Sequence, residues 1–215
     1  GAMDFATGVK LVARRGELMQ EAATTVESGM VSVLGLDEEK AQDLCRAARD
    51  GEVLVCANFN CPGQVVLSGQ VGACERAEKL AADFGATGAV RLKVAGAFHS
   101  EIMVPAARKF AETLAEVDFR RPVVPVISNV DCRPHGSANE IRAKLTAQLT
   151  SPVRWQQSME NLLSGGTRRF YEIGPGRVLS GLMRRIDRGA KVVSMQSREN
   201  VEKLAHEQIA ATSGS

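Results

Sequence analysis

Hydrophobic and polar residues alternate along the first half of the chain with two different periods. Stretches with a period of about 3.6 residues predict helices, and short β-branched runs between turn residues predict strands. The predicted helices span residues 5–21, 37–49 and 71–83, and the predicted strands span 30–34, 53–58, 64–68 and 89–94. The first helix carries Phe5, Val9, Val12 and Met19 on one side. The βαββαβ order that follows it predicts a ferredoxin-like subdomain over residues 22–95.

The second half of the chain alternates helices and strands in a different order. The predicted helices span residues 100–117, 137–149, 151–163, 178–186 and 198–211, and the predicted strands span 123–127, 169–173 and 191–195. Ser137 and Glu140 match a capping box, and Pro152 suits the first position of the next helix. This order is typical of a parallel, doubly wound sheet, although such sheets usually have more strands. We therefore expect an α/β fold with a partial parallel-sheet domain over residues 1–21 and 96–215.

Composition narrows the classes of function. The aromatic content of 4% argues against a base-stacking surface, and a net charge of +2 gives no strong attraction to nucleic acid or membranes. The five cysteines are irregularly spaced without a C-x-x-C pair. This pattern predicts free thiols in a reducing cytoplasm rather than a metal site or a disulfide framework. No bilayer-spanning segment or signal peptide is visible. We expect a cytoplasmic protein without a metal or cofactor.

His99 is the strongest candidate for acid–base chemistry. It lies in the stretch GAFHSEIM, between a predicted strand and a helix for which Ser100 is a good N-cap. The positive end of a helix dipole disfavours the imidazolium ion, so the ring stays neutral and can accept a proton. His135 and His206 fall in a predicted loop and in the terminal helix, where we expect solvated side chains.

Six motifs along the chain resemble those of the malonyl-CoA:acyl-carrier-protein transacylases, an acyltransferase family. They are LVARRGELMQ (11–20), NFNCPGQVVLSG (58–69), GAFHS (96–100), SNV (128–130), QLTSPVRW (148–155) and YEIGPGRVL (171–179). The resemblance runs from about Asp4 to about Ala205. It implies an α/β-hydrolase-like large domain with an inserted ferredoxin-like subdomain, which agrees with the element order found independently above.

The nucleophile of that family is a serine in a G-x-S-x-G elbow, which needs a strand, a tight turn and a helix. The 215 residues contain no such elbow, and Ser180, in the nearest match, falls inside a predicted helix. We therefore expect the family's N-terminal portion, on the order of a hundred residues, to lie outside this sequence, to be on a separate chain, or to be missing because the protein is a degenerate paralogue.

The resemblance implies a role for His99 and for Arg15. His99 would take the proton from the serine hydroxyl and return it to the leaving thiol. Arg15 would bind the free carboxylate of the malonyl group through two parallel hydrogen bonds. Arg14 is the competing assignment, but the register of the RGELMQ motif favours Arg15.

Three further residues receive roles from the resemblance. Phe98 matches the position where malonyl-specific polyketide acyltransferases carry phenylalanine, and its ring would crowd an α-methyl branch, although core packing is equally compatible. The backbone carbonyl of Gln148 would orient the imidazole in place of a triad carboxylate, so we expect replacement of its side chain to change little. For Asn129, a contact to pantetheine and a role in turn geometry both stay open.

The implied activity is transfer of malonyl from coenzyme A to the phosphopantetheine thiol of acyl carrier protein, by a ping-pong mechanism through a malonyl-serine ester. We expect this chain alone to be inactive. The alternatives are a non-catalytic module that binds carrier protein or coenzyme A, and the acyltransferase domain of a polyketide synthase. A further alternative is an enzyme with another nucleophile, such as Cys61 or Ser100. However, Ser100 adjoins His99, and neighbouring side chains at a helix start seldom point at each other.

Overall fold

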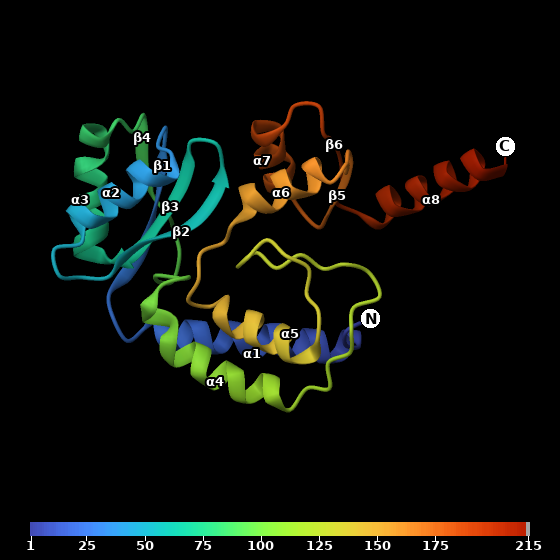
Figure 1. Cartoon of the computed structure of the whole chain (residues 1–215), viewed down its shortest axis with the longest axis horizontal. Helices are drawn as coiled ribbons and strands as arrows, with labels where there is room; N and C mark the ends of the chain where they lie inside the picture. Colours follow the sequence, from blue (N-terminus) through green and yellow to red (C-terminus); the bar gives the residue numbers. More distant parts are fainter. Residues whose placement is uncertain (214–215) are drawn as a thin grey trace. The chain divides into compact units, whose positions relative to one another are not determined.

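The computed structural model describes residues 1–213, with side-chain surroundings for residues 1–205. The chain has a mixed α/β fold and forms two compact units, Gly1–Ser158 and Met159–Ser215 (Figure 1). Within residues 1–213, no helix combines the length and the apolar character that crossing a membrane requires.

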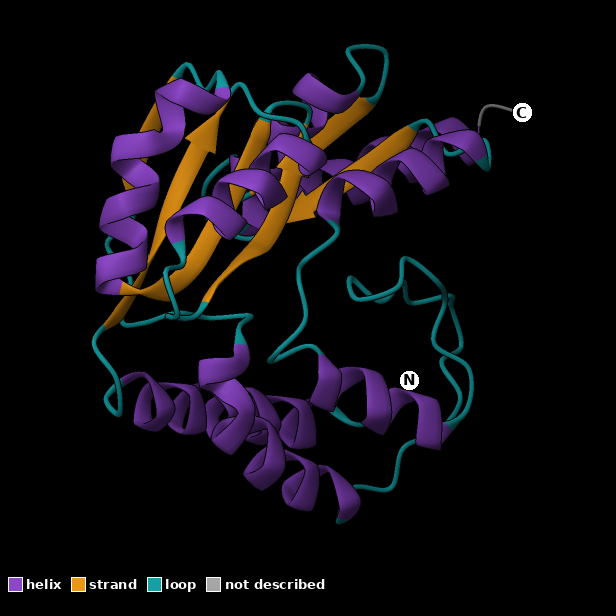
Figure 2. Cartoon of the chain, turned by 60° about the vertical axis from the view of Figure 1, so that its left-hand side comes forward, coloured by secondary structure: helices purple, strands orange, loops and turns teal. Residues whose placement is uncertain are grey.

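A four-stranded antiparallel sheet lies in the first unit, with strand order β2-β3-β1-β4. The strands are β1 (Ser28–Leu34), β2 (Leu54–Cys61), β3 (Gln64–Gln70) and β4 (Gly88–Arg91). The helices α2 (Glu38–Ala48) and α3 (Val71–Leu80) pack on one face of the sheet (Figure 2). The predicted βαββαβ order is therefore observed.

The local signals of this unit explain its boundaries. The Asp37 carboxylate accepts the Lys40 backbone N–H at 2.9 Å and starts α2. The side chains of α2 that are buried in the core between helix and sheet are Ala41, Leu44, Cys45 and Ala48. Gly63 adopts φ +70° in the turn between β2 and β3, and Gly85 adopts φ +91° where the helical stretch after α3 ends. Glycine adopts such angles without a steric penalty.

Three helices build a second core in the same unit. They are α1 (Phe5–Ala23), α4 (Val104–Ala115) and α5 (Ala138–Ala147), and α4 lies alongside both others (Figure 1). Their buried side chains include Leu18, Met103, Phe110 and Leu114. The predicted capping box is present at the start of α5, because Ser137 and Glu140 each accept the other's backbone N–H.

The apolar face predicted for α1 is wrong in three of its four positions. Phe5 and Val12 are 87% and 71% exposed, and Val9 is also exposed. Met19 is buried together with Leu11, Leu18, Ala22 and Ala23, which face α4 and the turn before it. The helix carries two apolar stripes at helical spacing, and only the packing of α4 decides which of them enters the core.

The strand predicted over residues 123–127 does not form. In the described structure this segment carries an isolated bridge between Ile127 and Pro134 instead. The His135 backbone N–H donates to the Val126 carbonyl at 2.8 Å, so the chain turns back on itself. Val123 is 85% exposed. β-branched residues favour extended backbone, but a strand also needs a neighbour to pair with.

The helix predicted from residue 151 starts later than expected. α6 spans Trp155–Ser164, so Pro152 lies before it rather than at its first position. Val153 extends the edge of the sheet instead, since its N–H donates to the Ala57 carbonyl at 2.8 Å and its carbonyl accepts the Phe59 N–H at 2.9 Å. Pairing with the free edge of β2 therefore overrides the local helix-start signal.

The second unit contains a parallel pair of strands, β5 (Arg169–Ile173) and β6 (Lys191–Met195). The helix α7 (Val178–Ile186) connects them, and α8 (Arg198–Ser213) follows. The Glu172 carboxylate accepts the backbone N–H groups of Leu179 at 2.8 Å and Ser180 at 3.0 Å. A carboxylate in this position satisfies the free donors at the start of α7 and complements its dipole.

Candidate active site

The loop between β4 and the 3-10 helix η2 (Glu101–Met103) carries His99. Ser100 caps η2 as predicted, because its hydroxyl accepts the Ile102 N–H at 3.3 Å. β4 ends at Arg91, short of the predicted strand, so His99 does not follow a strand directly. His99 adopts φ +60°, in the left-handed region that few residues other than glycine occupy. Such backbone geometry is concentrated at functional sites.

Two serines hold this loop in place. The Ser68 hydroxyl donates to the Phe98 carbonyl at 2.6 Å, and the Ser28 hydroxyl accepts the Ala97 N–H at 3.1 Å. Both serines come from the sheet, 30 and 69 residues away along the chain. Sequence reasoning missed them as supports of His99, because their separation leaves no local signal.

The His99 ring contacts the end of α5. Its Nδ1 lies 3.0 Å from the backbone carbonyl oxygen of Gln148, the residue that ends that helix. The Gln148 side-chain nitrogen lies 3.4 Å from the same Nδ1. We assign the proton to Nδ1, because a carbonyl oxygen only accepts and the shorter contact is the stronger one. Nε2 is then the nitrogen that can accept a further proton.

The environment keeps the His99 ring neutral. Burial is the largest influence and lowers the pKa of His99 below its ordinary value of 6.5. The hydrogen bond to the Gln148 carbonyl raises this pKa, and the positive charge of Arg15 lowers it. The neutral imidazole expected from the sequence is thus supported, with burial rather than the helix dipole as the main cause.

Arg15 reaches the same residue from α1. Its guanidinium donates to the side-chain oxygen of Gln148 at 2.5 Å. Burial lowers the pKa of Arg15, although a guanidinium keeps its charge at neutral pH. The neighbouring Arg14 is exposed and pairs with Glu17 at 3.1 Å. The structure thus brings His99, Gln148 and Arg15 together and leaves Arg14 out.

Phe98 and Asn129 differ in their surroundings. The Phe98 ring is half-buried and packs against the helical core and against the small cluster that includes Met30. Asn129 is half-buried, and its backbone carbonyl accepts the Arg154 N–H at 2.8 Å. The structure records this backbone contact for Asn129 and no side-chain contact with the His99 group among the described residues. The proposed roles of both residues stay predictions.

The alternative nucleophiles are occupied. Ser100 is buried, and its hydroxyl donates to the Ala97 carbonyl at 2.7 Å while it caps η2. Cys61 is buried, and its Sγ donates to the side-chain oxygen of Gln64 at 3.5 Å. Ser180 lies inside α7, as predicted, and its hydroxyl contacts the Glu172 carboxylate. Among the described residues, the Ser100 hydroxyl has hydrogen bonds within its own turn and none with His99.

The other two histidines are not part of this arrangement. His135 is half-buried rather than solvated, and burial lowers its pKa. The surroundings of the His206 side chain lie outside the described residues. Across residues 1–205, no three His, Cys, Asp or Glu side chains gather in a way that could hold a metal ion.

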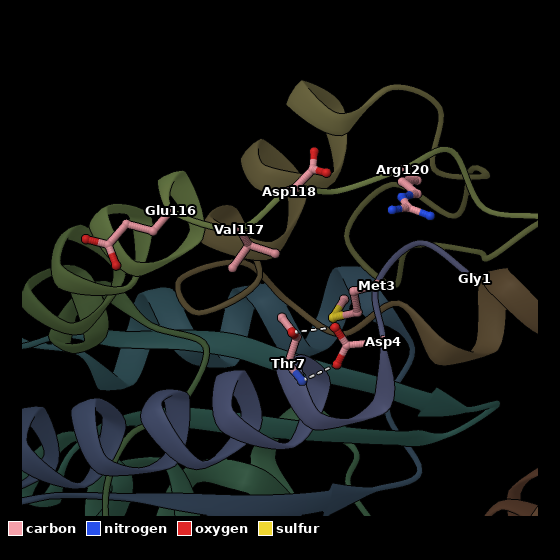
Figure 3. A pocket seen from close by; sticks show the side chains of 8 residues that line it. All are labelled: Gly1, Met3, Asp4, Thr7, Glu116, Val117, Asp118 and Arg120. Carbon is pink, nitrogen blue, oxygen red and sulfur yellow. Dashed lines mark hydrogen bonds between the residues drawn. The ribbon is translucent and has the colours of Figure 1, made fainter.

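A separate pocket of about 430 Å³ lies beside the start of α1 (Figure 3). It is lined by Asp4, Glu116, Asp118 and Arg120, among others. The Asp4 carboxylate accepts the backbone N–H of Thr7 at 2.8 Å, so it caps α1. None of the predicted site residues lines this pocket. Of its acidic residues, Asp4 caps α1, and Glu116 and Asp118 are exposed.

The chain is similar in sequence to known acyl transferases. A family profile described as acyl transferase domain matches residues 1–211. The chain is 41% identical over 203 residues to a malonyl CoA-acyl carrier protein transacylase of Bacillus subtilis, covering 94% of this chain and 64% of that protein. The chain therefore spans less than two thirds of the length of this curated relative.

Solved structures of malonyl transacylases match the fold of this chain. The structure of a malonyl CoA-acyl carrier protein transacylase from Coxiella burnetii matches with a TM-score of 0.91 and 38% identity, over 95% of this chain and 65% of that one. A malonyl transacylase solved in complex with its type II polyketide acyl carrier protein matches with a TM-score of 0.89 and 38% identity. That match covers 93% of this chain and 65% of the other.

Proposed function

The chain belongs to the acyltransferase family, and from this premise we propose that it provides the base and the carboxylate-binding arginine of a malonyl-CoA:acyl-carrier-protein transacylase. The observation that carries the proposal is the junction at Gln148. Its carbonyl oxygen lies 3.0 Å from His99 Nδ1, and its side chain accepts from Arg15 at 2.5 Å. A base and a carboxylate-binding group thus meet at one residue.

The proposed mechanism has two half-reactions. Nε2 of His99 takes the proton of a serine hydroxyl, the serine oxygen attacks the thioester carbonyl of malonyl-CoA, and the carbon–sulfur bond breaks. The proton then passes from His99 to the departing thiolate. In the second half, His99 takes the proton of the phosphopantetheine thiol, and the sulfur attacks the carbonyl carbon of the malonyl-serine ester. The bond between that carbon and the serine oxygen breaks, and His99 returns the proton to the serine oxygen. The Gln148 carbonyl stabilises the imidazolium that forms in each half.

Arg15 supplies the specificity in this proposal. A guanidinium can hold the free carboxylate of a malonyl group with two parallel hydrogen bonds, whereas an acetyl group offers no such partner. The Phe98 ring, in contact with two clusters of the core, would restrict room for an α-methyl branch. Asn129 would contact pantetheine in this proposal. Malonyl-CoA is a substrate, and no cofactor is proposed.

The fold supports a finer description. We propose that the four-stranded sheet with α2 and α3 is a ferredoxin-like subdomain, because its antiparallel order β2-β3-β1-β4 is the one that a βαββαβ chain forms there. We also propose that β5 and β6, paired in parallel, belong to an α/β-hydrolase-like sheet. The five free thiols support the cytoplasmic location proposed from the sequence.

The test measures malonyl transfer to holo acyl carrier protein by intact mass. The chain is assayed alone and together with a separate segment bearing a G-x-S-x-G elbow, because its own 215 residues contain no such motif. We expect transfer in the mixture only. Transfer by the chain alone would mean that another residue carries the acyl group. No transfer in the mixture, combined with tight binding of carrier protein, would favour the non-catalytic module.

Variants assign the roles within the active mixture. His99→Ala is expected to lower kcat by about a hundredfold to ten-thousandfold, since it removes the general base. Arg15→Ala is expected to raise KM for malonyl-CoA and to remove the preference for malonyl over acetyl. Arg14→Ala is the matched control and is expected to change neither constant. A polyketide carrier protein is the second candidate acceptor, because one relative was solved with such a partner.

A further inference from the structure

Two cysteine side chains meet between α2 and β2, away from the residues of the proposed active site. The Sγ atoms of Cys45 and Cys56 are 3.8 Å apart. Cys45 lies in the last turns of α2 and Cys56 lies near the start of β2. Both are free thiols. The proposed acyl transfer uses neither of them, so their proximity has no explanation in that reaction.

The pair is reachable from solvent on one side. Both cysteines line a surface hollow of about 400 Å³. Cys45 is buried, whereas Cys56 is partly exposed. Of the three arginines that line the hollow, Arg46 pairs with Asp43, Arg154 lies 3.7 Å from Glu38, and the third is Arg49. Because Cys56 is the more exposed of the two residues, we expect a small neutral oxidant to reach it before Cys45.

We propose that Cys45 and Cys56 form an oxidation site, at which a peroxide converts the two thiols to a disulfide that links α2 to β2. The Cys56 sulfur attacks one peroxide oxygen, the O–O bond breaks, and water and a sulfenic acid form. The Cys45 sulfur then attacks the Cys56 sulfur, the S–O bond breaks, and a second water leaves. In total the two thiols lose two electrons and two protons, and hydrogen peroxide is reduced to two waters.

The local structure allows the two sulfurs to close from 3.8 Å to bonding distance, about 2.05 Å. β2 has a register shift between Cys56 and Asn58, where the ladder with β3 is already interrupted. The turn between α2 and β2 contains Asp50 and Gly51, both in the left-handed region. A bulge and a turn are the segments of this region that can adjust without breaking the sheet.

The order of the two steps follows from the surroundings. The hydrogen bond with Cys56 and burial both raise the pKa of the Cys45 thiol, which makes Cys45 the poorer first nucleophile. Cys45 is nevertheless in contact with the Cys56 sulfur and is therefore placed to resolve the sulfenic acid. Cys74 belongs to the same core and is the competing partner that the experiment must exclude.

The first experiment counts thiols in the intact chain. The reduced protein is treated with hydrogen peroxide, denatured, alkylated with iodoacetamide and weighed, with and without reduction by a phosphine before the alkylation. We expect the number of alkylated cysteines to fall from five to three, and to return to five after reduction by a phosphine. Oxidation of a single cysteine to a sulfinic acid, without a reversible link, would overturn the proposal.

The second experiment locates the link. Trypsin cuts after Arg46 and chymotrypsin cuts after Phe59, so Cys45 and Cys56 end on different peptides, and Cys56 is separated from Cys74. We expect one cross-linked species, joining the peptides that contain Cys45 and Cys56. A link between any other two cysteines would show that the 3.8 Å contact does not direct the oxidation.

Variants separate the two roles. Cys56→Ser is expected to lose the link, and Cys45→Ser is expected to leave a sulfenic acid at Cys56 that dimedone traps. Cys132→Ser is the matched control and is expected to form the link as the parent does. Circular dichroism of the reduced variants verifies that they are folded. The proposal is wrong if Cys56→Ser still loses two thiols reversibly on oxidation.

Discussion

At the scale of single residues, Gln148 joins the two groups on which the proposed chemistry depends. Its backbone carbonyl contacts His99 Nδ1, and its side-chain oxygen accepts from Arg15. The first contact fixes the tautomer of the ring, and the second holds the guanidinium close to it. The Gln148 side chain thus has a contact of its own, and we expect its replacement to affect Arg15.

Replacing Gln148 with alanine tests this dual use. The backbone carbonyl stays in place, so the orientation of His99 is expected to persist, but Arg15 loses its partner. A hydrogen bond to a charged group is worth about 1.5–3 kcal/mol, so KM for malonyl-CoA should rise about tenfold to a hundredfold while kcat changes little. Steady-state kinetics of the active mixture measure both constants. A fall in kcat as large as that of His99→Ala, with KM unchanged, would contradict the assignment.

The lowered pKa of His99 predicts how stability depends on pH. The unfolded chain takes up this proton near pH 6.5, whereas the folded chain does so at a lower pH because the ring is buried. Between these two pKa values the unfolded state binds more protons, so the free energy of unfolding falls as pH decreases through that window. Above the ordinary histidine pKa of 6.5, the contribution of His99 to the free energy of unfolding is fully present.

Urea unfolding of the parent and of His99→Asn, at about pH 7.5 and about pH 5.5, measures this effect. The variant is expected to lose less stability on acidification than the parent. His135→Asn serves as the comparison, because burial also lowers the pKa of His135. Each histidine should account for part of the stability that the parent loses on acidification. An identical loss in the parent and in His99→Asn would exclude the assigned environment of His99.

At the scale of secondary-structure elements, the close packing of β3 against the segment that enters β2 depends on one glycine. A Cβ atom on Gly69 would lie 2.1 Å from the Val53 carbonyl oxygen and 2.8 Å from the Leu54 Cα. Both are backbone atoms, which cannot rotate away. Gly29, its partner on β1, has open space where a Cβ would lie.

Alanine substitutions at these paired glycines are expected to have opposite effects. Gly69→Ala should destabilise the chain by about 1–3 kcal/mol or more, because the strands must move apart. Gly29→Ala should be neutral or stabilise by up to about 1 kcal/mol, since alanine restricts the unfolded chain. Urea unfolding followed by circular dichroism compares the two variants. Equal effects at both positions would mean that β2 and β3 do not approach as closely as described.

At the scale of the whole molecule, large apolar side chains stay exposed in both units. In the first unit these include Phe5 at 87% and Val123 at 85%, and in the second unit Ile173 is 79% exposed. Exposed apolar residues scattered singly are normal, but Phe5, Val9 and Val12 follow each other along one stripe of α1. This chain by itself thus presents apolar surface that favours contact with other protein surfaces.

We expect the isolated chain to associate as its concentration rises. Sedimentation velocity over a range of concentrations measures the association, and the triple variant Phe5→Ser, Val9→Thr, Val12→Thr is expected to shift the equilibrium toward the monomer. Because these side chains lie outside the core, the variant should keep the unfolding midpoint of the parent within a few degrees. Unchanged association in the triple variant would show that the stripe on α1 is not the surface involved.

Features whose signals are local can be predicted from the sequence alone. The caps of α2 and α5, the turn at Gly63 and the order of elements in the first unit all follow from neighbouring residues. The family-like motifs likewise pointed to His99, Arg15 and Gln148 as residues of the candidate site. Local hydrogen bonds and backbone preferences act over a few residues, so a single sequence carries enough information to predict them.

The remaining features depend on partners far away in the chain, so no local pattern predicts them. The core-facing stripe of α1 is chosen by α4, the late start of α6 is set by pairing of Val153 with β2, and residues 123–127 lack a strand to pair with in the described fold. The contact from Arg15 to the Gln148 side chain and the meeting of Cys45 with Cys56 also arise from packing. Contacts of this kind are selected by the energy of the assembled core, which no local pattern contains.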